Sequence, residues 1–288
     1  MNPPARLHVQ AVGDGRAPPV LLIQGLGQQL IDWPGELIAA LAANRRVILC
    51  DNRDAGLSPL FGPAADPALT ESDFPESDGS AAAGAPYTLH DMAEDARAVL
   101  DRLGIERADV VGYSMGGMIA QILAAEHPAR VRRLVSLMSS DGAPAIDATP
   151  RAWQAMARSI TCRGERERRI DMLTDDAAVY RGPHLAFDRG EVRRHVAAAL
   201  DRADRPAGIL RQALAVGGSG DRRALLPRIA CPTLVVHGSD DPVIACAQGR
   251  RAAALIPAAR LEILDRAGHD FAPPVAQALV ALLPDFLG

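Results

Sequence analysis

The chain has 288 residues, a hydrophobic fraction of 48% and a formal net charge of −4. This length suits one large α/β domain, and so small a net charge predicts neither nucleic acid nor a membrane surface as a partner. The sequence contains no lysine. Schiff-base, Ser–Lys and phosphate-binding P-loop lysine chemistry are therefore excluded.

The four cysteines form no C-x-x-C pair, and Cys50 and Cys231 border apolar runs, as small core residues do. Residues 1–10 contain no apolar signal core, and no apolar run reaches the length of a membrane span. These features favour a reduced, cytoplasmic protein.

The first part of the chain predicts an edge strand over residues 7–12 and a buried parallel strand over residues 20–23. The buried strand runs into Gln24-Gly25-Leu26-Gly27. Two glycines after a strand are compatible with a dinucleotide loop, but Leu30 replaces the third glycine of that fingerprint. The alternative is an oxyanion loop, which offers a backbone N–H to a developing negative charge. We favour the oxyanion loop because a serine turn follows downstream.

A third strand is predicted over residues 47–50, followed by a polar loop, Asp51-Asn52-Arg53-Asp54. Asp51 or Asp54 could be catalytic, but we favour Arg53 pairing with neighbouring carboxylates and fixing the loop. Residues 61–86 carry acidic charges, no basic ones, and many Pro, Ala, Gly and Ser residues. This composition predicts an irregular insertion, which either borders a pocket mouth or is a solvated loop.

The most informative stretch begins after a helix predicted over residues 88–103. Here Val110-Val111 lead into Gly112-Tyr113-Ser114-Met115-Gly116, and a helix-forming run follows. A serine hydroxyl is a weak nucleophile and must reach a base and a substrate together. A sharp strand–turn–helix element presents it in this way, and Gly112 and Gly116 avoid a collision across the turn. Ser114 is therefore a candidate nucleophile.

After a strand over residues 131–138, strand patterns vanish until about residue 223, and helices are predicted over 152–160, 192–200 and 207–216. Fifteen arginines lie between Arg151 and Arg223, mixed with acids, which is typical of solvated helix faces. Strands return at residues 231–237 and 261–264, before a closing helix. The order of elements predicts a parallel sheet with helices on both faces and a helical cap.

Two loops after the last strands supply candidate partners for the serine. His269 lies in a glycine-bounded loop at the carboxyl end of the last strand, whereas surface, capping or strand-end roles suit the other six histidines. Asp241 closes a Gly-x-x-Asp turn after the preceding strand and is rigidified by the proline that follows. Asp240 and Asp141 are its competitors. The chain order Ser, Asp, His is typical of a nucleophile elbow on a parallel sheet.

Taken together, these motifs resemble the α/β-hydrolase family over nearly the whole chain. The resemblance implies Ser114 as nucleophile, His269 as general base and acid, and Asp241 as its orienting partner. It also implies an oxyanion hole formed by the backbone N–H groups of Leu26 and Met115. Many members have histidine where Gln24 stands.

The family architecture predicts an α/β-hydrolase fold with a mostly parallel central sheet and a helical cap inserted after the sixth strand. We expect a core over residues 1–140, including the acidic insertion 61–86, a cap over 141–225, and the rest of the core over 226–288. Residues 24–33, residues 51–58 and the helix start at Tyr87 are also similar to the aclacinomycin methylesterase subgroup. That likeness implies hydrolysis of a methyl ester on a bulky polyketide.

The function expected from this resemblance is hydrolysis of a small-molecule carboxylic ester, without a cofactor or metal, through an acyl-enzyme on Ser114. Lactone hydrolysis, C–C bond hydrolysis and cofactor-free perhydrolase or haloperoxidase-type activity would use the same residues. A ligand receptor that has lost turnover is a further alternative.

Overall fold

The fold was analysed in a computed structural model that describes residues 3–66, 68–76, 78, 84–161, 164–257 and 259–288. A seven-stranded sheet forms its centre, with strand order β1-β3-β2-β4-β5-β6-β7. β1 is antiparallel to β3, and all other neighbours are parallel. The strands are β1 (Val9–Val12), β2 (Ala17–Ile23), β3 (Arg45–Cys50), β4 (Ala108–Tyr113), β5 (Val131–Leu137), β6 (Thr233–Gly238) and β7 (Ala259–Leu264). The predicted α/β-hydrolase architecture is confirmed.

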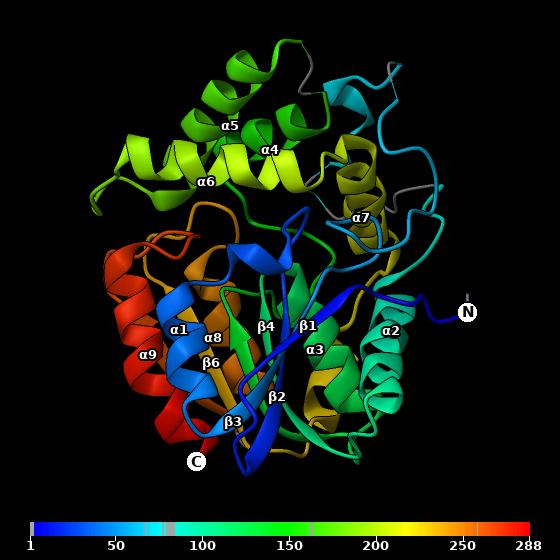
Figure 1. Cartoon of the computed structure of the whole chain (residues 1–288), viewed down its shortest axis with the longest axis vertical. Coiled ribbons are helices and arrows are strands. Elements are labelled where there is room, and N and C mark those ends of the chain that lie inside the picture. Colours follow the sequence, from blue (N-terminus) through cyan, green and yellow to red (C-terminus); the bar gives the residue numbers. More distant parts are fainter. Residues whose placement is uncertain (1–2, 67, 77, 79–83, 162–163, 258) are drawn as a thin grey trace.

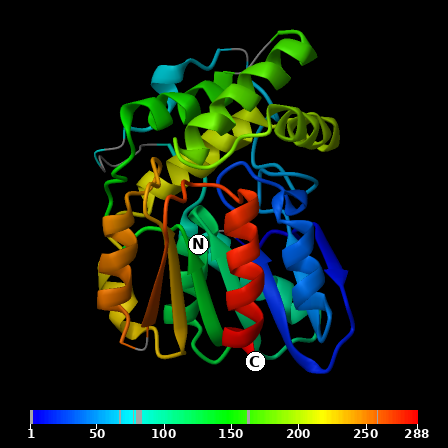
Figure 2. The ribbon, with the colours of Figure 1, turned by 90° about the vertical axis from the view of Figure 1, so that its left-hand side faces the viewer.

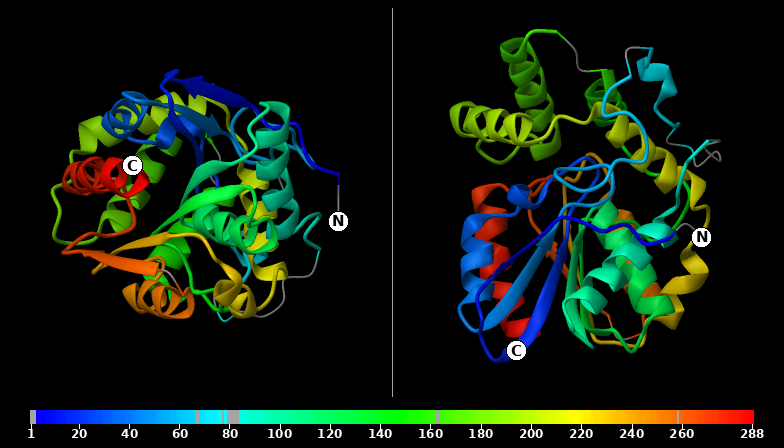
Figure 3. Two further views of the ribbon diagram at one scale, coloured as in Figure 1. Left: turned by 90° about the horizontal axis from the view of Figure 1, so that it is seen from below. Right: turned by 45° about the vertical axis from the view of Figure 1, so that its right-hand side comes forward.

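Helices cover both faces of the sheet, because alternate strand residues point to opposite sides and both sides are apolar. α2 (Leu89–Arg102), α3 (Met115–Glu126) and α8 (Cys246–Leu255) pack on one face, and α1 (Gly35–Ala42) and α9 (Pro273–Leu287) on the other. Figures 1 and 2 show these helices around the sheet, and the view from below in Figure 3 separates the two helical layers. The predicted start of α2 is confirmed, since Thr88 forms a capping box with Asp91.

A helical insert lies between β5 and β6. It contains α4 (Pro150–Thr161), α5 (Arg166–Arg181), α6 (Arg189–Arg202) and α7 (Pro206–Gly218). The insert lies above one end of the sheet (Figure 1). It follows the fifth strand in chain order, not the sixth as expected, because residues 3–8 form no additional strand before β1. α5 had not been predicted.

The acidic insertion packs more closely than a solvated loop would. Its described part contains a short 3₁₀ helix, Glu71–Asp73, followed by Phe74, which is buried. The Phe74 ring packs edge-on against Trp153 of α4, with ring centroids 5.2 Å apart, and also belongs to a small core with α7. This packing places the segment against the insert; none of its described residues lines the main cavity described below.

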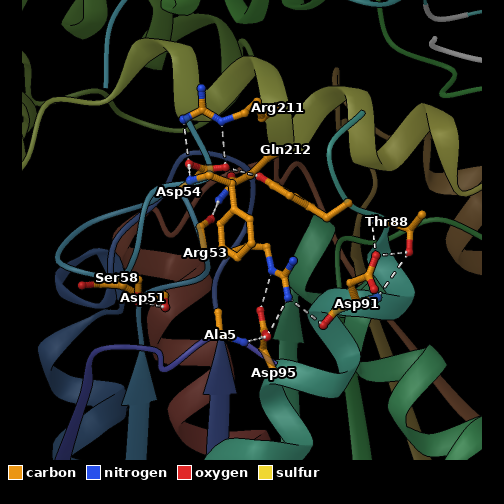
Figure 4. A network of polar contacts seen from close by, with 12 residues as sticks. Ala5, Asp51, Arg53, Asp54, Ser58, Thr88, Asp91, Asp95, Arg211 and Gln212 are labelled. Carbon is orange, nitrogen blue, oxygen red and sulfur yellow. Dashed lines mark hydrogen bonds and ion pairs between the residues drawn. The ribbon is translucent and has the colours of Figure 1, made fainter. Parts of the chain in front are cut away.

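The polar loop after β3 is fixed by ion pairs, as expected, but its partners differ from those predicted. Arg53 is fully buried and pairs with Asp95 of α2 rather than with its neighbours in sequence. Asp51 and Asp54 instead pair with Arg202 of α6 and with Arg211 of α7. The two acids therefore tie the insert to the core, as Figure 4 shows for Asp54 and Arg211. Neither acid contacts Ser114 in the hydrogen-bond network of the described residues.

A further contact joins insert and core through a histidine. His195 Nε2 of α6 lies 2.6 Å from Oδ1 of Asp32. This hydrogen bond raises the pKa of His195 above its ordinary value, against the opposing effect of burial. The contact should therefore depend on pH.

We expect the His195–Asp32 contact to stabilise the protein in acid and to weaken in alkali. A raised folded-state pKa means that the added stability is complete below the unfolded value of about 6.5 and is lost as the pH rises through the folded value. Thermal midpoints of the wild type and of His195→Gln should differ more at pH 5.5 than at pH 9. A difference that is the same at both pH values would contradict this account.

Candidate active site

The turn between β4 and α3 holds Ser114 in an unusual backbone conformation. Ser114 has φ 55° and ψ −120° and immediately precedes the first residue of α3. A Cβ on Gly112 would lie 2.2 Å from the Gly116 carbonyl oxygen, and one on Gly116 would lie 2.1 Å from the Ile23 oxygen. Both positions are glycine and carry no side chain, so the backbone segments can approach this closely. The tight turn presents the serine at the end of β4.

The side chains of Ser114, His269 and Asp241 form a hydrogen-bonded chain. His269 Nε2 lies 2.9 Å from Ser114 Oγ, and His269 Nδ1 lies 2.7 Å from Asp241 Oδ2. With Nδ1 protonated, the imidazole donates to the carboxylate and can accept the serine proton. All three residues are at least nine-tenths buried. These residues, 155 positions apart at the extremes, thus meet in the geometry required for nucleophilic catalysis.

Asp241 is held as a carboxylate by several donors. Its Oδ1 accepts hydrogen bonds from the backbone N–H groups of Val243 and Ile244, both 2.9 Å away. Burial raises the pKa of Asp241, but the charge and hydrogen bond of His269, together with His237, outweigh burial and hold the pKa well below its ordinary range. The carboxyl group therefore remains ionised and can orient His269.

The two competitors of Asp241 have other partners. Asp240 lies 3.6 Å from His184 at the surface, and Asp141 pairs with Arg251. His237 is a buried strand-end residue that donates from Nε2 to the Ile244 carbonyl at 2.7 Å, as expected. The same nitrogen also lies 3.3 Å from Asp241 Oδ2, a contact that the sequence did not predict.

His269 is positioned through its backbone as well as through its side chain. Its N–H donates to the carbonyl of Tyr180, in α5 of the insert, at 2.7 Å, and its carbonyl accepts from the Tyr113 hydroxyl at 2.8 Å. A Cβ on Gly268 would lie 2.3 Å from the Arg181 carbonyl oxygen, so only glycine fits beside α5. The insert therefore helps to fix the histidine loop.

The oxyanion hole expected from the sequence would use the N–H groups of Leu26, which lines the cavity beside Ser114, and of Met115, which follows Ser114. Among the hydrogen bonds of the described residues, neither the Leu26 nor the Met115 N–H has a protein acceptor. Met115 is the first residue of α3, where N–H groups lack partners within the helix and the helix dipole is positive. Gln24, in place of the usual histidine, is fully buried, accepts from the Gly25 N–H and does not line the cavity.

A cavity of about 650 Å³ opens beside Ser114 and His269, between the strand ends and the insert. Both the core and the insert contribute apolar side chains to its wall. They include Trp33 and Phe271 from the core and Met156, Leu173, Phe187, Val196 and Ile209 from the insert. Such a volume suits a substrate of drug-like size.

The charged side chains of this wall are mainly acidic. Among the described lining residues, seven are acids and three are arginines. Arg169 pairs with Asp204 and Arg181 with Asp270, while Arg205 donates to the Ser58 carbonyl. Burial raises the pKa of both Asp176 and Asp270. Both carboxyl groups have therefore lost solvation on folding, and five of the seven lining acids, these two included, form ion pairs.

No helix among the described residues is both long and apolar enough to cross a membrane.

Comparison with known proteins agrees with the fold. The profile of the family described as alpha/beta hydrolase fold matches residues 18–272. Rhodomycin D methylesterase DauP from Streptomyces sp. (strain C5) is 27% identical, with 96% of this chain and 93% of that protein covered. The 2-hydroxymuconate semialdehyde hydrolase from Pseudomonas sp. (strain CF600) is 29% identical, with coverages of 93% and 86%.

Among solved structures, the enol-lactonase from Burkholderia xenovorans LB400 is similar, with a TM-score of 0.74 and 28% identity over 98% of this chain and 96% of that chain. The family match spans most of the sequence and includes the serine turn as well as the Asp241 and His269 loops. The chain belongs to the α/β-hydrolase family and is a hydrolase of the serine type.

Proposed function

We propose that the protein hydrolyses carboxylic esters through an acyl-enzyme on Ser114. The observation that carries this proposal is the continuous hydrogen-bonded chain from Ser114 Oγ through His269 to the ionised Asp241. It lies beside two backbone N–H groups that have no protein acceptor among the described residues.

In the proposed reaction, Ser114 Oγ attacks the ester carbonyl carbon while its proton passes to His269 Nε2. The negative charge that develops on the carbonyl oxygen is stabilised by the Leu26 and Met115 N–H groups, each contributing about 3 kcal/mol. Collapse of the tetrahedral intermediate breaks the bond to the alcohol, which takes the proton from His269. Water then loses a proton to His269 and attacks the acyl carbon. As the second tetrahedral intermediate collapses, His269 returns this proton to Ser114 Oγ, and the acid is released.

The charge of the cavity supports an ester whose acyl and alcohol parts carry no carboxylate. The three lining arginines already have acceptors, in Asp204, Asp270 and the Ser58 carbonyl. A substrate carboxylate would therefore be buried without an arginine of the described lining to pair with, and an unpaired buried charge is costly. The name of one relative denotes a muconate semialdehyde, whereas the name of the methylesterase denotes a methyl ester, a group that carries no carboxylate charge. The cavity therefore favours a bulky neutral ester, including a methyl ester.

Lactone hydrolysis is the second candidate, because the enol-lactonase shares the fold at 28% identity. A lactone is a cyclic ester, so the same attack would open its ring without releasing an alcohol. C–C bond hydrolysis and peroxide-dependent chemistry use the same three side chains. A panel of an open-chain ester, a lactone and a β-diketone, each with and without peroxide, separates these activities.

We expect Ser114→Ala to lower kcat for a p-nitrophenyl ester by about 10³-fold or more and to abolish labelling by a fluorophosphonate. The hydroxyl is the proposed nucleophile, and the fold should tolerate its removal because alanine differs only by that group. The measurement is steady-state turnover together with mass spectrometry of the labelled protein. An alanine variant with full activity would refute the assignment of the nucleophile.

We also expect discrimination by substrate charge. A neutral ester of a bulky acid should have a kcat/KM at least about tenfold higher than the same ester bearing a remote carboxylate, because this factor corresponds to about 1.4 kcal/mol of charge repulsion. Asp176→Asn should narrow this ratio, since it removes a lining acid and leaves Arg158 without that carboxylate. A preference for the carboxylate-bearing ester, or a ratio unchanged in Asp176→Asn, would count against a role for cavity charge.

A further inference from the structure

Helix α7 of the insert reaches the loop that carries Leu26. Gln212 of α7 is fully buried, and its side-chain oxygen accepts a hydrogen bond from the Gly27 N–H at 2.7 Å. Its side-chain nitrogen donates to the Arg53 carbonyl, also at 2.7 Å (Figure 4). Both ends of the amide are used, so a flipped amide would place N–H against N–H and lose both bonds.

Other contacts hold α7 tightly against the same part of the core. Arg211 forms two hydrogen bonds to the carboxylate of Asp54, at 2.9 and 2.7 Å. A Cβ on Gly208 would lie 2.2 Å from the Asp54 carbonyl oxygen, so helix and loop are in direct contact there. Figure 4 shows Arg211 and Gln212 reaching down from α7 to this loop. The backbone of α7 that carries Gln212 is therefore held in place against the core.

The peptide group that Gln212 holds is next to the one that bears the Leu26 N–H. Gly27 has a φ of +68°, and the side chain of Ile209 of α7 packs beside it, 2.9 Å from where a Cβ would lie. Glycine in such a turn can rotate its peptide plane easily. If Gln212 were removed, the Gly27 N–H would lose its acceptor, and turning toward the cavity would be one way to satisfy it. The two peptide groups share the Cα of Leu26, so the backbone adjustment that accompanies this rotation would also displace the Leu26 N–H.

We propose that Gln212 is a positioning residue for the hydrolytic reaction: it holds the Gly27 N–H so that the Leu26 N–H stays aimed at the oxyanion. This inference rests on the proposed function, in which Leu26 supplies part of the oxyanion hole. If so, the oxyanion hole depends on both the core and the insert. The core supplies the N–H of Leu26, and the insert supplies Gln212, which lies 185 residues after Gly27 in the sequence. Both the enclosure of the substrate and the stabilisation of the transition state then depend on the packing of α7 against the core.

The test compares Gln212→Met with a matched control, Gln248→Met. Gln248 is equally buried and, like Gln212, is not among the residues that line the cavity, but it lies on α8 and donates to the Ala145 carbonyl. We expect Gln212→Met to lower kcat for a neutral ester about 10- to 100-fold, with KM within about threefold of the wild type, because a displaced oxyanion donor weakens mainly the transition state. The rate of fluorophosphonate labelling should fall in parallel, whereas Gln248→Met should keep both rates.

A second variant separates the two ends of the amide. Gln212→Glu keeps an oxygen that can accept from Gly27 but loses the donor to Arg53, so its kcat should lie between those of the wild type and Gln212→Met. An unshifted kcat in Gln212→Met, or equal losses of kcat in Gln212→Met and Gln248→Met, would overturn the inference while leaving the proposed function intact. A wild type that neither hydrolyses esters nor reacts with the fluorophosphonate would instead overturn the proposed function.

If neither variant folds, the contact between Gln212 and Gly27 can still be tested in the wild-type protein by hydrogen exchange. Amide hydrogen exchange of Gly27 should be slow and should match that of the central amides of α7, because its N–H is bonded to a buried side chain of that helix. Exchange at the rate of an unprotected loop amide would overturn the inference.

Discussion

The left-handed backbone at Ser114 is the constraint on which the rest of the site depends. A non-glycine residue with φ 55° and ψ −120° costs about 1–3 kcal/mol and persists only where its surroundings impose it. Here the constraint comes from close packing around the turn. Only glycine fits at position 112, where β4 meets α3, and at position 116, where α3 meets the end of β2. The same turn brings Oγ to within 2.9 Å of His269 Nε2 and places Met115, the residue proposed to donate to the oxyanion, at the first position of α3.

The helical insert covers the cavity and also forms hydrogen bonds to loops of the site. Through Gln212 it contacts the loop of Leu26, and through the Tyr180 carbonyl it contacts the loop of His269. Arg202 and Arg211 add ion pairs to the buried carboxylates of Asp51 and Asp54, whose solvation was lost on folding and must be replaced. The insert thus contacts two loops of the site, through α7 and through α5.

Much of this arrangement could be predicted from the sequence because it is local. Short apolar runs marked the strands, and candidate residues that follow parallel strands were expected to meet at one edge, as Ser114, Asp241 and His269 do. Their catalytic roles remain a proposal, as do the compartment and the boundaries at residues 140 and 225. The partners of Arg53 and Gln212 were not predictable, because they depend on how distant helices pack. Helix α5 was not predicted because its sequence lacks a continuous apolar stripe: the residues it buries include Asp176 and Arg181.

The central claim is that an acyl group is transferred to Ser114 during turnover. Its most direct measurement is rapid acid quenching of the enzyme during hydrolysis of a slowly deacylating neutral ester, followed by peptide mass spectrometry. The account predicts an added acyl mass on the peptide that contains Ser114, formed and lost at rates consistent with turnover. Ester turnover with no acyl mass on that peptide, or with the mass on a different residue, would contradict the account.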